Sequence, residues 1–414
     1  MARLHLAGAL VLLVAACSSL SASPDRPVPT RAVLLVSVDG LRTDALGSGT
    51  MPTLDALAAA GVQAEWMNPS YPTLTFPNHY TMVTGLRPDH HGIVNNTILD
   101  PVLGRFSLRN RDAVSDPRWW GGKPAWVSLQ EHGGRAATMF WPGSEAPIAG
   151  QHPSDWLPFD GDVGANERVD QILAWLDREP AQRPRLVTLY FDQVDHEEHA
   201  WGPGSPQALT AQAHVDAALA RLLDGLEARG IRDRVDLIVV SDHGMAAVPP
   251  GQREYINDWL AAKGLPIDAV EVVTRGSSMG VNPADGADAE AVVAAFVGRH
   301  AHGECWRKQE LPVRWHYGSH ARVPAIVCQA DIGWLLMERF PNPRTSTHHT
   351  GAHGYAPEAP EMRAVFIADG PSFADGAHLP AFDNVDVYPL LMRLLDVPAE
   401  PNDGDPDTFD SVLH

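Results

Sequence analysis

Apolar runs alternate with amphipathic stretches along the first 240 residues of the chain. Residues 31–38, 135–140, 186–191 and 235–240 are apolar or β-branched nearly throughout, which is typical of strands that are buried on both faces. Apolar positions that recur every three or four residues predict helices at 53–60, 124–132, 166–176 and 206–228. This alternation predicts an α/β fold with a mostly parallel central sheet sandwiched by helices.

The pattern becomes less regular after residue 250. It predicts a short helix at 254–263, strands at 270–273, 323–328 and 363–368, and a closing helix at 386–395. The chain contains no internal repeat and no low-complexity block. We therefore expect residues 31–414 to form a single domain with a large core.

Three carboxylates follow predicted strands. Asp39 ends the first strand, Asp195 lies just past the third, and Asp242 comes directly after the fourth, next to His243. Parallel sheets bind ligands at the carboxyl ends of their strands. We therefore expect these side chains to meet at one site.

A short polar turn at residues 71–79 is bounded by Pro72 and Pro77 and leads into an amphipathic run that Gly85 stops. Thr75 then lies at or beside a helix N-terminus, where unpaired N–H groups and the helix dipole favour a negative oxygen. Taken alone, Thr75 is an ordinary helix-capping residue. A cation that held its hydroxyl as an alkoxide would make it a nucleophile instead.

Histidines complete a candidate metal centre. Asp195 and His199 are four residues apart, a spacing that brings both to one metal on a helical turn and favours His199 over His196. His353 is framed by glycines, which let the backbone approach a crowded site. Carboxylates and imidazoles without thiolates suit catalytic zinc, or manganese. Six other histidines are expected to lie on the surface or in packing contacts: His300, His302, His316, His320, His348 and His349.

Charge narrows the choice of partners. The 414 residues carry a net charge of −20, which argues against a nucleic-acid polymer, because phosphate backbones select basic surfaces. A small phosphorylated substrate is compatible with this charge, because a bound metal supplies local positive charge. No sequence pattern specifies an oligomeric state.

Residues 1–17 predict an export signal, because Arg3 precedes an apolar run that is too short to span a bilayer. The run ends at Cys17 in a segment that resembles a bacterial lipoprotein cleavage box, which would make Cys17 an acylated membrane tether. The alternative is an ordinary secretory signal cut near residues 21–23. Residues 18–30 read as a Ser/Pro-rich tether. Both alternatives export the protein, either to the periplasm or as a membrane-anchored lipoprotein.

Two further cysteines, Cys305 and Cys328, then lie in an oxidising compartment. We expect them to form a disulfide. Two buried thiols are the alternative.

Taken together, the motifs resemble the nucleotide pyrophosphatase/phosphodiesterase family of the alkaline phosphatase superfamily. The resemblance runs in order from about residue 32 to about residue 397, and residues 73–96 are its most specific part. It is carried by Val38-Asp39-Gly40, Pro72-Thr73-Leu74-Thr75-Phe76-Pro77-Asn78-His79, Thr84-Gly85-Leu86-Arg87-Pro88, His91-Gly92-Ile93-Val94-Asn95-Asn96, Trp141-Pro142-Gly143-Ser144-Glu145, Asp242-His243-Gly244-Met245 and His353-Gly354-Tyr355.

The resemblance implies an alkaline-phosphatase-like fold, one phosphodiesterase catalytic domain over residues 31–414, and two zinc ions. Thr75 is then the nucleophile, and Asn96 is a neutral hydrogen-bond donor beside it. The residues that match one zinc site are Asp39, Thr75, Asp242 and His243, and those that match the other are Asp195, His199 and His353. The candidates for a pocket that stacks on a nucleobase are Phe76, Phe159 and Tyr190, with Leu108 as a further lining residue.

The chain departs from the family in one place. The residue before the histidine that His199 matches is usually small, whereas here Glu197 and Glu198 precede His199. We expect both carboxylates to face solvent; the alternative is that they change the charge around the zinc site.

The resemblance also implies a mechanism in which Thr75 attacks phosphorus and forms a phospho-threonine intermediate, which water then hydrolyses. Three aspartates and an ionised Thr75 would balance the charge of two zinc ions. Asn96 is neutral, which suits a singly charged diester better than a doubly charged monoester. A nucleotide phosphodiester or pyrophosphate is therefore the expected substrate.

Other functions stay open. A phosphodiesterase that acts on lipid head groups would use the aromatic pocket to hold choline, and a phosphomonoesterase would belong to the same superfamily. A sulfatase is disfavoured, because residues 75–78 lack the arginine of the C/S-x-P-x-R segment. The non-enzyme alternative is an exported zinc-binding module, which leaves a hydroxyl aimed at the metals unexplained.

Overall fold

The computed structural model describes Met1, residues 31–339 and residues 350–414. The predicted export signal and tether, with Cys17, lie outside the described residues, as do His348 and His349. In the part of the chain that is described, no helix is both long and apolar enough to cross a membrane.

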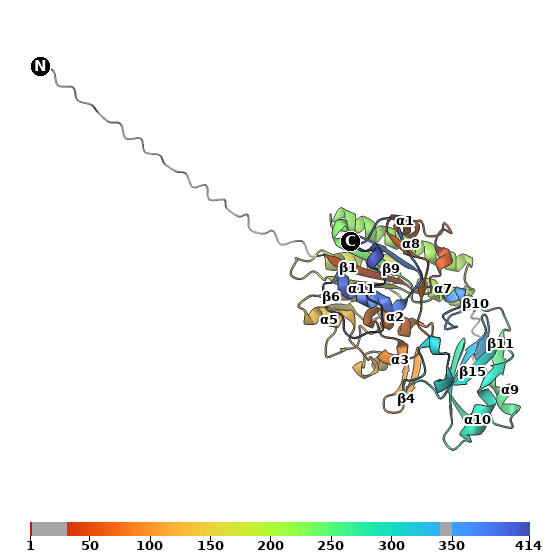
Figure 1. Ribbon diagram of the computed structural model, residues 1–414. Coiled ribbons are helices and arrows are strands. Elements are labelled where there is room, and N and C mark those ends of the chain that lie inside the picture. Colours follow the sequence, from red (N-terminus) through yellow and green to blue (C-terminus); the bar gives the residue numbers. More distant parts are fainter. Residues whose placement is uncertain (2–30, 340–349) are drawn as a thin grey trace.

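Eight strands form the central sheet, and the continuous apolar runs build its middle (Figure 1). In spatial order the strands are β20 (Ala377–Leu379), β2 (Val62–Ala64), β19 (Phe366–Asp369), β9 (Val235–Val240), β1 (Ala32–Val38), β8 (Leu186–Phe191), β6 (Ala136–Met139) and β7 (Asp155–Leu157). Neighbouring strands pair in parallel except at β19, which runs antiparallel to both β2 and β9. The expected mostly parallel sheet is confirmed.

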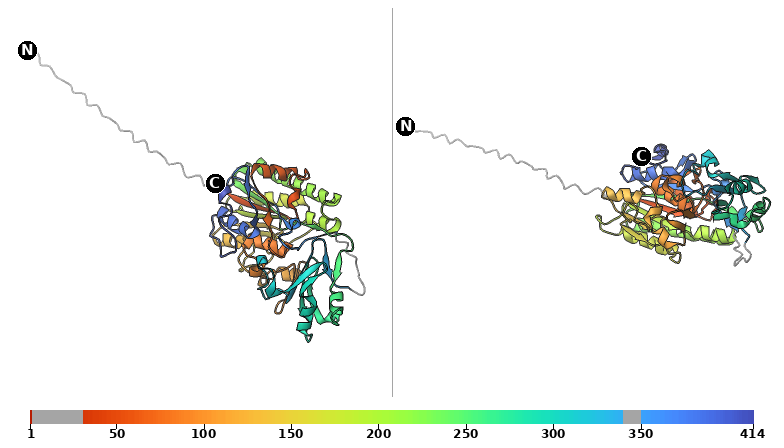
Figure 2. Two further views of the ribbon diagram at one scale, coloured as in Figure 1. Left: turned by 45° about the vertical axis from the view of Figure 1, so that its right-hand side comes forward. Right: turned by 90° about the horizontal axis from the view of Figure 1, so that it is seen from below.

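Alternate residues of β1 enter two separate cores, because successive side chains of a strand point to opposite faces. Val33 and Leu35 belong to the core that contains residues of α2, α5 and α11. Leu34 and Val36 belong to the core that contains residues of α1, α6 and α8. Figures 1 and 2 show helices covering both faces of the sheet.

The α-helices are α1 (Pro52–Ala60), α2 (Thr75–Thr84), α3 (Pro88–His91), α4 (Arg111–Val114), α5 (Ala125–Glu131), α6 (Ala165–Leu176), α7 (Gln193–Trp201), α8 (Pro206–Ala228), α9 (Ile256–Ala261), α10 (Ala289–Phe296) and α11 (Val387–Leu394). Short 3-10 helices are η1 (Thr43–Ala45), η2 (Pro117–Trp119), η3 (Arg232–Arg234), η4 (Ile267–Ala269), η5 (Lys308–Glu310), η6 (Val313–Trp315), η7 (Pro360–Met362), η8 (Asn384–Asp386) and η9 (Asp410–Val412).

The segment between β9 and β19 adds a second, antiparallel sheet, which lies at one end of the molecule in Figure 1. Its five strands in order are β12 (Val270–Thr274), β13 (Ser278–Pro283), β16 (Ile326–Ala330), β15 (Gly303–Arg307) and β14 (Gly298–His300). Residues of α9 and α10 share a third hydrophobic core with this sheet. Cys305 on β15 faces Cys328 on β16, and the two form the expected disulfide.

Four two-stranded pairs complete the fold: β10 (Ala246–Ala247) with β18 (Gly351–Ala352), β11 (Arg253–Tyr255) with β17 (Leu335–Met337), β21 (Phe382–Asp383) with β3 (Met67–Asn68), and β4 (Thr97–Asp100) with β5 (Gly104–Ser107).

Several sequence predictions about individual elements are wrong or displaced. The strand expected at 363–368 spans Phe366–Asp369, and the helix expected at 254–263 spans only Ile256–Ala261, because Arg253–Tyr255 form β11. The run after Thr75 is not amphipathic, because every residue of α2 except Phe76 is buried between neighbouring segments that include α3 and α11. The strand expected at 323–328 instead spans Ile326–Ala330, after Pro324, which has no N–H to donate to a sheet.

Candidate active site

The candidate site lies at the carboxyl ends of the central strands, where residues that follow these strands come together. Asp39 and Asp242 follow the neighbouring strands β1 and β9. Asp195 and His199 lie on α7, which begins two residues after β8. Thr75 is the first residue of α2 and is 7% exposed, while Leu74 takes the capping position. Thr75 is therefore not the cap residue itself.

His243 is the centre of the first group of side chains. Its Nε2 lies 3.4 Å from Oγ1 of Thr75, 3.5 Å from Oδ1 of Asp39 and 2.9 Å from Oδ2 of Asp242. All four residues are buried. The structure thus brings together the four side chains that match one zinc site.

Asp195 is the centre of the second group. Its Oδ1 lies 3.5 Å from Nε2 of His199 and 3.5 Å from Nε2 of His353. The rings of His353 and His243 stack with centroids 3.7 Å apart, so that the two groups adjoin. Ligand atoms of Asp195, His243 and His353 all lie within 4.8 Å of one another, as do those of Asp39, Asp242 and His243.

All three histidines present the same ring nitrogen to these carboxylates. Nδ1 of His199 lies 3.0 Å from the carbonyl oxygen of Gly351, and Nδ1 of His353 lies 2.9 Å from that of Thr73. Nδ1 of His243 lies 2.9 Å from the carbonyl oxygen of Gly244. A carbonyl accepts only from a protonated Nδ1, which leaves Nε2 as a lone-pair ligand in each neutral ring.

The carboxylates each leave one buried oxygen without a hydrogen bond. The orphaned atoms are Oδ1 of Asp39, Oδ1 of Asp195 and Oδ2 of Asp242. Each is also the atom that faces an imidazole Nε2. Burying an unpartnered carboxylate oxygen is costly unless a cation satisfies it. Three orphaned carboxylate oxygens and three aligned imidazole nitrogens therefore fit bound divalent metal of the zinc type.

The electrostatics of the protein atoms differ among these groups. Although burial opposes both shifts, the charge of Asp242 raises the pKa of His243, and the charge of His243 lowers the pKa of Asp242. Burial, together with the charges of Asp242 and Asp195, raises the pKa of Asp39 well above its ordinary value. Burial, together with His243 and His199, lowers the pKa of His353 well below its ordinary value and keeps that ring neutral. Without a cation, the site thus disfavours the charge on Asp39 that metal binding requires.

Glycines allow the close approach of the backbone at two points. A Cβ on Gly351 would lie 2.2 Å from the carbonyl oxygen of Glu198, so α7 and β18 could not pack as they do. Gly40 has a φ of +74°, and a Cβ there would lie 3.2 Å from Cα of Asp195. Both positions help to bring His199, His353 and Asp195 together.

Asn96 lies next to the start of α2. Its Oδ1 accepts a hydrogen bond of 3.0 Å from the backbone N–H of Phe76. This bond orients the amide, so that Nδ2 is its remaining donor.

The structure divides the predicted aromatic pocket into two parts. The ring of Phe159, which is 39% exposed, lies 6.1 Å from that of Tyr190. Phe76 packs instead against Phe106 and Trp120. Leu108 is 36% exposed just after β5.

Tyr190 has a second contact that the sequence did not predict. Its buried hydroxyl donates a hydrogen bond of 2.5 Å to Oδ2 of Asp39. The apolar run of β8 signals a buried strand, but it contains no sign of a polar partner for one of its side chains.

His79, Thr73 and Ser37 are further residues of the site to which sequence reasoning gave no role. Nδ1 of His79 lies 2.9 Å from the carbonyl oxygen of Thr75, and its Nε2 lies 2.8 Å from Oγ of Ser37. The hydroxyl of Thr73 accepts a hydrogen bond from the N–H of Gly354, beside His353. The spacing of His79 four residues after Thr75 on α2 was the one available signal.

One expectation about the neighbouring carboxylates is wrong. Glu198 does not face solvent but is 1% exposed, with Nε2 of Gln212 3.5 Å from its Oε1. Burial, followed by the charge of Asp195, raises its pKa to about 8. α7 packs against α8 at this point, so helix packing decides the burial of Glu198. Glu197 is partly exposed, and His196 is exposed and takes no part in the site.

Comparison with known proteins identifies the family of this chain. Residues 33–356 match the family model described as type I phosphodiesterase/nucleotide pyrophosphatase. An uncharacterised pyrophosphatase/phosphodiesterase of Schizosaccharomyces pombe is 35% identical over 92% of this chain and 79% of its own length. A venom phosphodiesterase of Macrovipera lebetinus is 34% identical, over 92% of this chain and 45% of its own length. Ectonucleotide pyrophosphatase/phosphodiesterase family member 3 of Rattus norvegicus is also 34% identical, and the match covers 92% of this chain and 44% of the rat protein. The chain thus spans less than half the length of the last two relatives.

Solved structures show the same fold. Murine ectonucleotide pyrophosphatase/phosphodiesterase 5, as an inactive threonine-to-alanine variant in complex with AMP, superposes with a TM-score of 0.86 at 31% identity and covers 93% of this chain and 100% of its own. The human counterpart gives a TM-score of 0.86 at 29% identity, over 92% of this chain and 100% of its own. The fold is therefore alkaline-phosphatase-like. The chain belongs to the type I phosphodiesterase/nucleotide pyrophosphatase family and is a hydrolase of phosphodiester or anhydride bonds.

Proposed function

We propose that this enzyme hydrolyses phosphodiester or pyrophosphate bonds of nucleotides with Thr75 as a covalent nucleophile. The observation that carries the proposal is the position of the Thr75 hydroxyl, 3.4 Å from Nε2 of His243 at the start of α2. Asp39 and Asp242 leave orphaned carboxylate oxygens beside the same nitrogen. A hydroxyl in that place is held where a cation would lower its pKa.

Two zinc ions are the proposed cofactors. Asp39, Thr75, Asp242 and His243 would hold one, and Asp195, His199 and His353 would hold the other. When bound, the two ions would supply positive charge that keeps Thr75 ionised and offsets the charge of the phosphoryl oxygens.

The chain's own residues perform the displacement. Thr75 Oγ1 attacks phosphorus, the leaving oxygen departs on the opposite side, and the phosphoryl group with its retained substituent stays on Thr75. Nδ2 of Asn96, which its bond to the Phe76 N–H leaves as a donor, stabilises a non-bridging oxygen as charge builds. Water then cleaves the threonine ester and restores the hydroxyl.

A diester is favoured over a monoester, because the donor beside Thr75 is a neutral amide. Arg87, a basic residue near the motif in sequence, donates to Asp383 and lines a different cavity with Asp383 and Asp403. The exposed Phe159 beside Tyr190 would hold the nucleobase by stacking, which tolerates any base. AMP in the murine neighbour supports a small nucleotide ligand.

We further propose that residues 31–414 act as one catalytic unit and that the protein is exported, by the signal expected at residues 1–17. Relatives named as venom and ectonucleotide enzymes support export. Periplasmic release and a lipid tether at Cys17 are distinguished by mass spectrometry of the mature N-terminus.

The proposal is tested with Thr75→Ala and Thr75→Ser on a nucleotide diester and the corresponding monoester, with zinc content measured on each protein. We expect Thr75→Ala to retain substantial zinc and lose turnover by at least about 10³-fold, while Thr75→Ser retains part of the activity. Turnover by zinc-loaded Thr75→Ala at the wild-type rate would overturn the mechanism. Wild-type activity on the monoester that equals or exceeds activity on the diester would overturn the substrate assignment.

A further inference from the structure

A cavity of about 540 Å³ opens beside the reaction centre. His199, His353 and Asn96 form one part of its wall, whereas Asp39, Asp242 and His243 do not line it. The cavity therefore adjoins the group around Asp195 rather than the group that holds the Thr75 hydroxyl.

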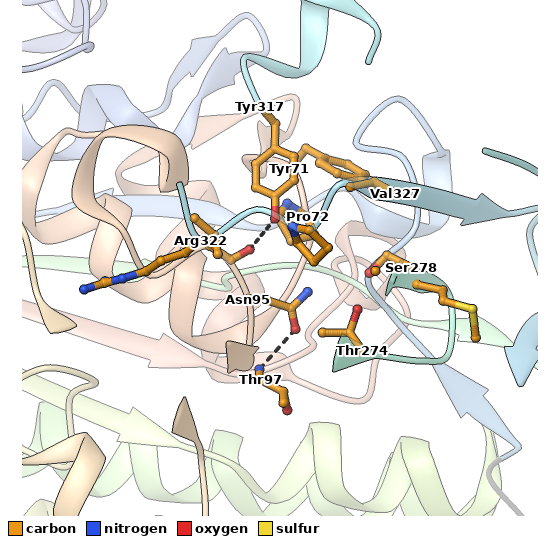
Figure 3. A pocket seen from close by; sticks show the side chains of 13 residues that line it. Tyr71, Pro72, Asn95, Thr97, Thr274, Ser278, Tyr317, Arg322 and Val327 are labelled. Atoms are coloured by element: carbon orange, nitrogen blue, oxygen red, sulfur yellow. Dashed lines mark hydrogen bonds between the residues drawn. The ribbon is translucent and has the colours of Figure 1, made fainter. Parts of the chain in front are cut away.

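The cavity lies at the junction between the β4–β5 hairpin and the smaller sheet. The β4–β5 hairpin supplies one side, and the segment from Val273 to Ser278 supplies another. Figure 3 draws an adjoining small cavity at this junction, of about 10 Å³, in which Asn95 and Thr97 lie opposite Thr274 and Ser278. These four residues line both cavities, so the larger one extends along the same junction.

Three arginines from separate segments reach the wall of the larger cavity. Arg105 comes from β5, Arg253 from β11, and Arg275 from the loop after β12. No Asp or Glu among the described residues lines this cavity, although the chain carries a net charge of −20. The wall of this cavity is therefore basic, whereas the protein as a whole is acidic.

Neighbouring carboxylates offset only part of this charge. Arg275 pairs with Glu338 at 3.0 Å, and Arg105 lies 3.9 Å from Glu271 in a long pair whose members are both about half exposed. Arg253 has no ion pair with a carboxylate of residues 31–339 or 350–414. The wall thus retains positive charge, in planar donor groups that match phosphate oxygens.

The geometry of displacement decides which part of a substrate would enter. The attacking and leaving oxygens lie on opposite sides of phosphorus. Thr75 attacks from the side of His243, so the leaving group points toward the side of Asp195, where His199 and His353 line the cavity.

We propose that Arg105, Arg253 and Arg275 form a subsite for a leaving group that itself carries phosphate. The inference rests on the proposed function and deepens it. The enzyme then prefers nucleotide anhydrides, such as nucleoside triphosphates that release pyrophosphate, over diesters whose leaving group is an uncharged alcohol or a choline head group. Cleavage consumes water, breaks the bond between the α-phosphorus and its bridging oxygen, and releases a nucleoside monophosphate and pyrophosphate.

The test uses two substrates that share the retained group: thymidine 5′-triphosphate and the p-nitrophenyl ester of thymidine 5′-monophosphate. We expect Arg→Gln at each of the three positions to lower kcat/KM for the triphosphate by about 10-fold, and the ester to change by less than about 2-fold. Arg221→Gln, an exposed arginine on α8 that pairs with Asp170, is the matched control and is expected to change neither.

Binding provides a second readout without turnover. The zinc-loaded Thr75→Ala protein is titrated calorimetrically with thymidine 5′-triphosphate and thymidine 5′-monophosphate. We expect the triphosphate to bind at least about 10-fold more tightly, and the triple Arg→Gln variant to lose this selectivity while its affinity for the monophosphate is kept.

The outcomes separate the two claims. In one outcome the wild type hydrolyses the ester, and the triple variant still prefers the triphosphate as strongly as the wild type does. This outcome would overturn the arginine subsite but not the proposed function. Absence of wild-type activity on both substrates would overturn the proposed function and the subsite with it. An intact affinity for the monophosphate shows that the variants are folded.

Discussion

The backbone N–H of Phe76 donates a hydrogen bond of 3.0 Å to Oδ1 of Asn96. This bond joins the residue after the proposed nucleophile to the residue proposed to stabilise the phosphoryl oxygens. It also decides which atom of the amide is available, because an occupied Oδ1 leaves Nδ2 as the donor. The first turn of α2 therefore positions both the hydroxyl of the proposed nucleophile and the amide of Asn96.

Substitution of Asn96 tests this role. Asn96→Asp keeps an oxygen that accepts from Phe76, but it removes the donor and adds a negative charge beside the phosphoryl group. We expect kcat/KM for a nucleotide diester to fall by roughly 10² to 10³-fold, the loss typical of an oxyanion-stabilising donor. Asn166→Asp, on the exposed first turn of α6, is the control. A loss of less than about 3-fold would exclude Asn96 from transition-state stabilisation.

Tyr190 has two candidate roles, and one substitution separates them. Tyr190→Phe keeps the ring beside Phe159 and removes only the hydroxyl that donates to Asp39. Because partners of metal ligands orient those ligands, we expect zinc affinity to fall by about 10 to 100-fold, with an unchanged KM for nucleotide at saturating zinc. Zinc competition with a chelator measures the affinity. A raised KM with unchanged zinc affinity would assign Tyr190 to the nucleotide alone.

The disulfide between Cys305 and Cys328 closes a loop with a sequence separation of 23 residues between adjacent strands of the smaller sheet. Replacing both cysteines by serine is expected to lower the free energy of unfolding by about 3 kcal/mol. Because none of the proposed metal ligands lies on β15 or β16, we expect zinc content to stay unchanged. Hydrogen exchange should show the loosening in the smaller sheet first. Loss of protection in the central sheet to the same extent would contradict this local effect.

His91 predicts an acid-dependent loss of stability. The N–H of Ile93 donates to its Nδ1, and Thr81 lies 3.1 Å from its Nε2, so the fold accommodates the neutral ring. Burial lowers the pKa of His91 to about 3. A depressed pKa means that between the unfolded value near 6.5 and the folded value only the unfolded chain takes up the proton. Stability is therefore lost as the pH falls below about 6.5.

The expected size of this effect is about 2 kcal/mol between pH 7.5 and pH 5. Urea unfolding of the wild type and of His91→Gln at both pH values measures it. The variant should have a lower free energy of unfolding than the wild type at pH 7.5. On going to pH 5, it should not lose the further stability of about 2 kcal/mol that the wild type loses through His91. Equal pH dependence in the two proteins would contradict the assignment to His91.

Much of the central sheet could be predicted from the sequence. The bounds of β8, β9 and α8 agree with the predicted ranges, because continuous β-branched runs and a Ser205–Pro206 helix start are strong local signals. In the smaller sheet, strands were predicted near β12 and β16, whereas β13, β14 and β15 were missed. β14 has only three residues, and β13 and β15 contain Gly280 and Gly303, so the sequence pattern of these three strands is weak.

In the candidate site, too, the features that follow from the order of strands could be predicted, whereas those that depend on contacts between distant segments could not. The topology of a parallel sheet suffices to expect Asp39, Asp242 and Asp195 near one another, and the structure places them so. The burial of Glu198 depends on where α8 crosses α7, which no local pattern specifies. The same holds for the wall of three arginines, since its members come from distant parts of the chain.

The covalent role of Thr75 is tested most directly by the stereochemistry at phosphorus. A nucleotide phosphorothioate diester of known configuration is hydrolysed in water enriched in oxygen-18, and the configuration of the product is determined. Two successive in-line displacements, first by Thr75 and then by water, each invert phosphorus, so the account predicts overall retention. Overall inversion would mean that water attacks the substrate directly, and would contradict the proposal that Thr75 is the nucleophile.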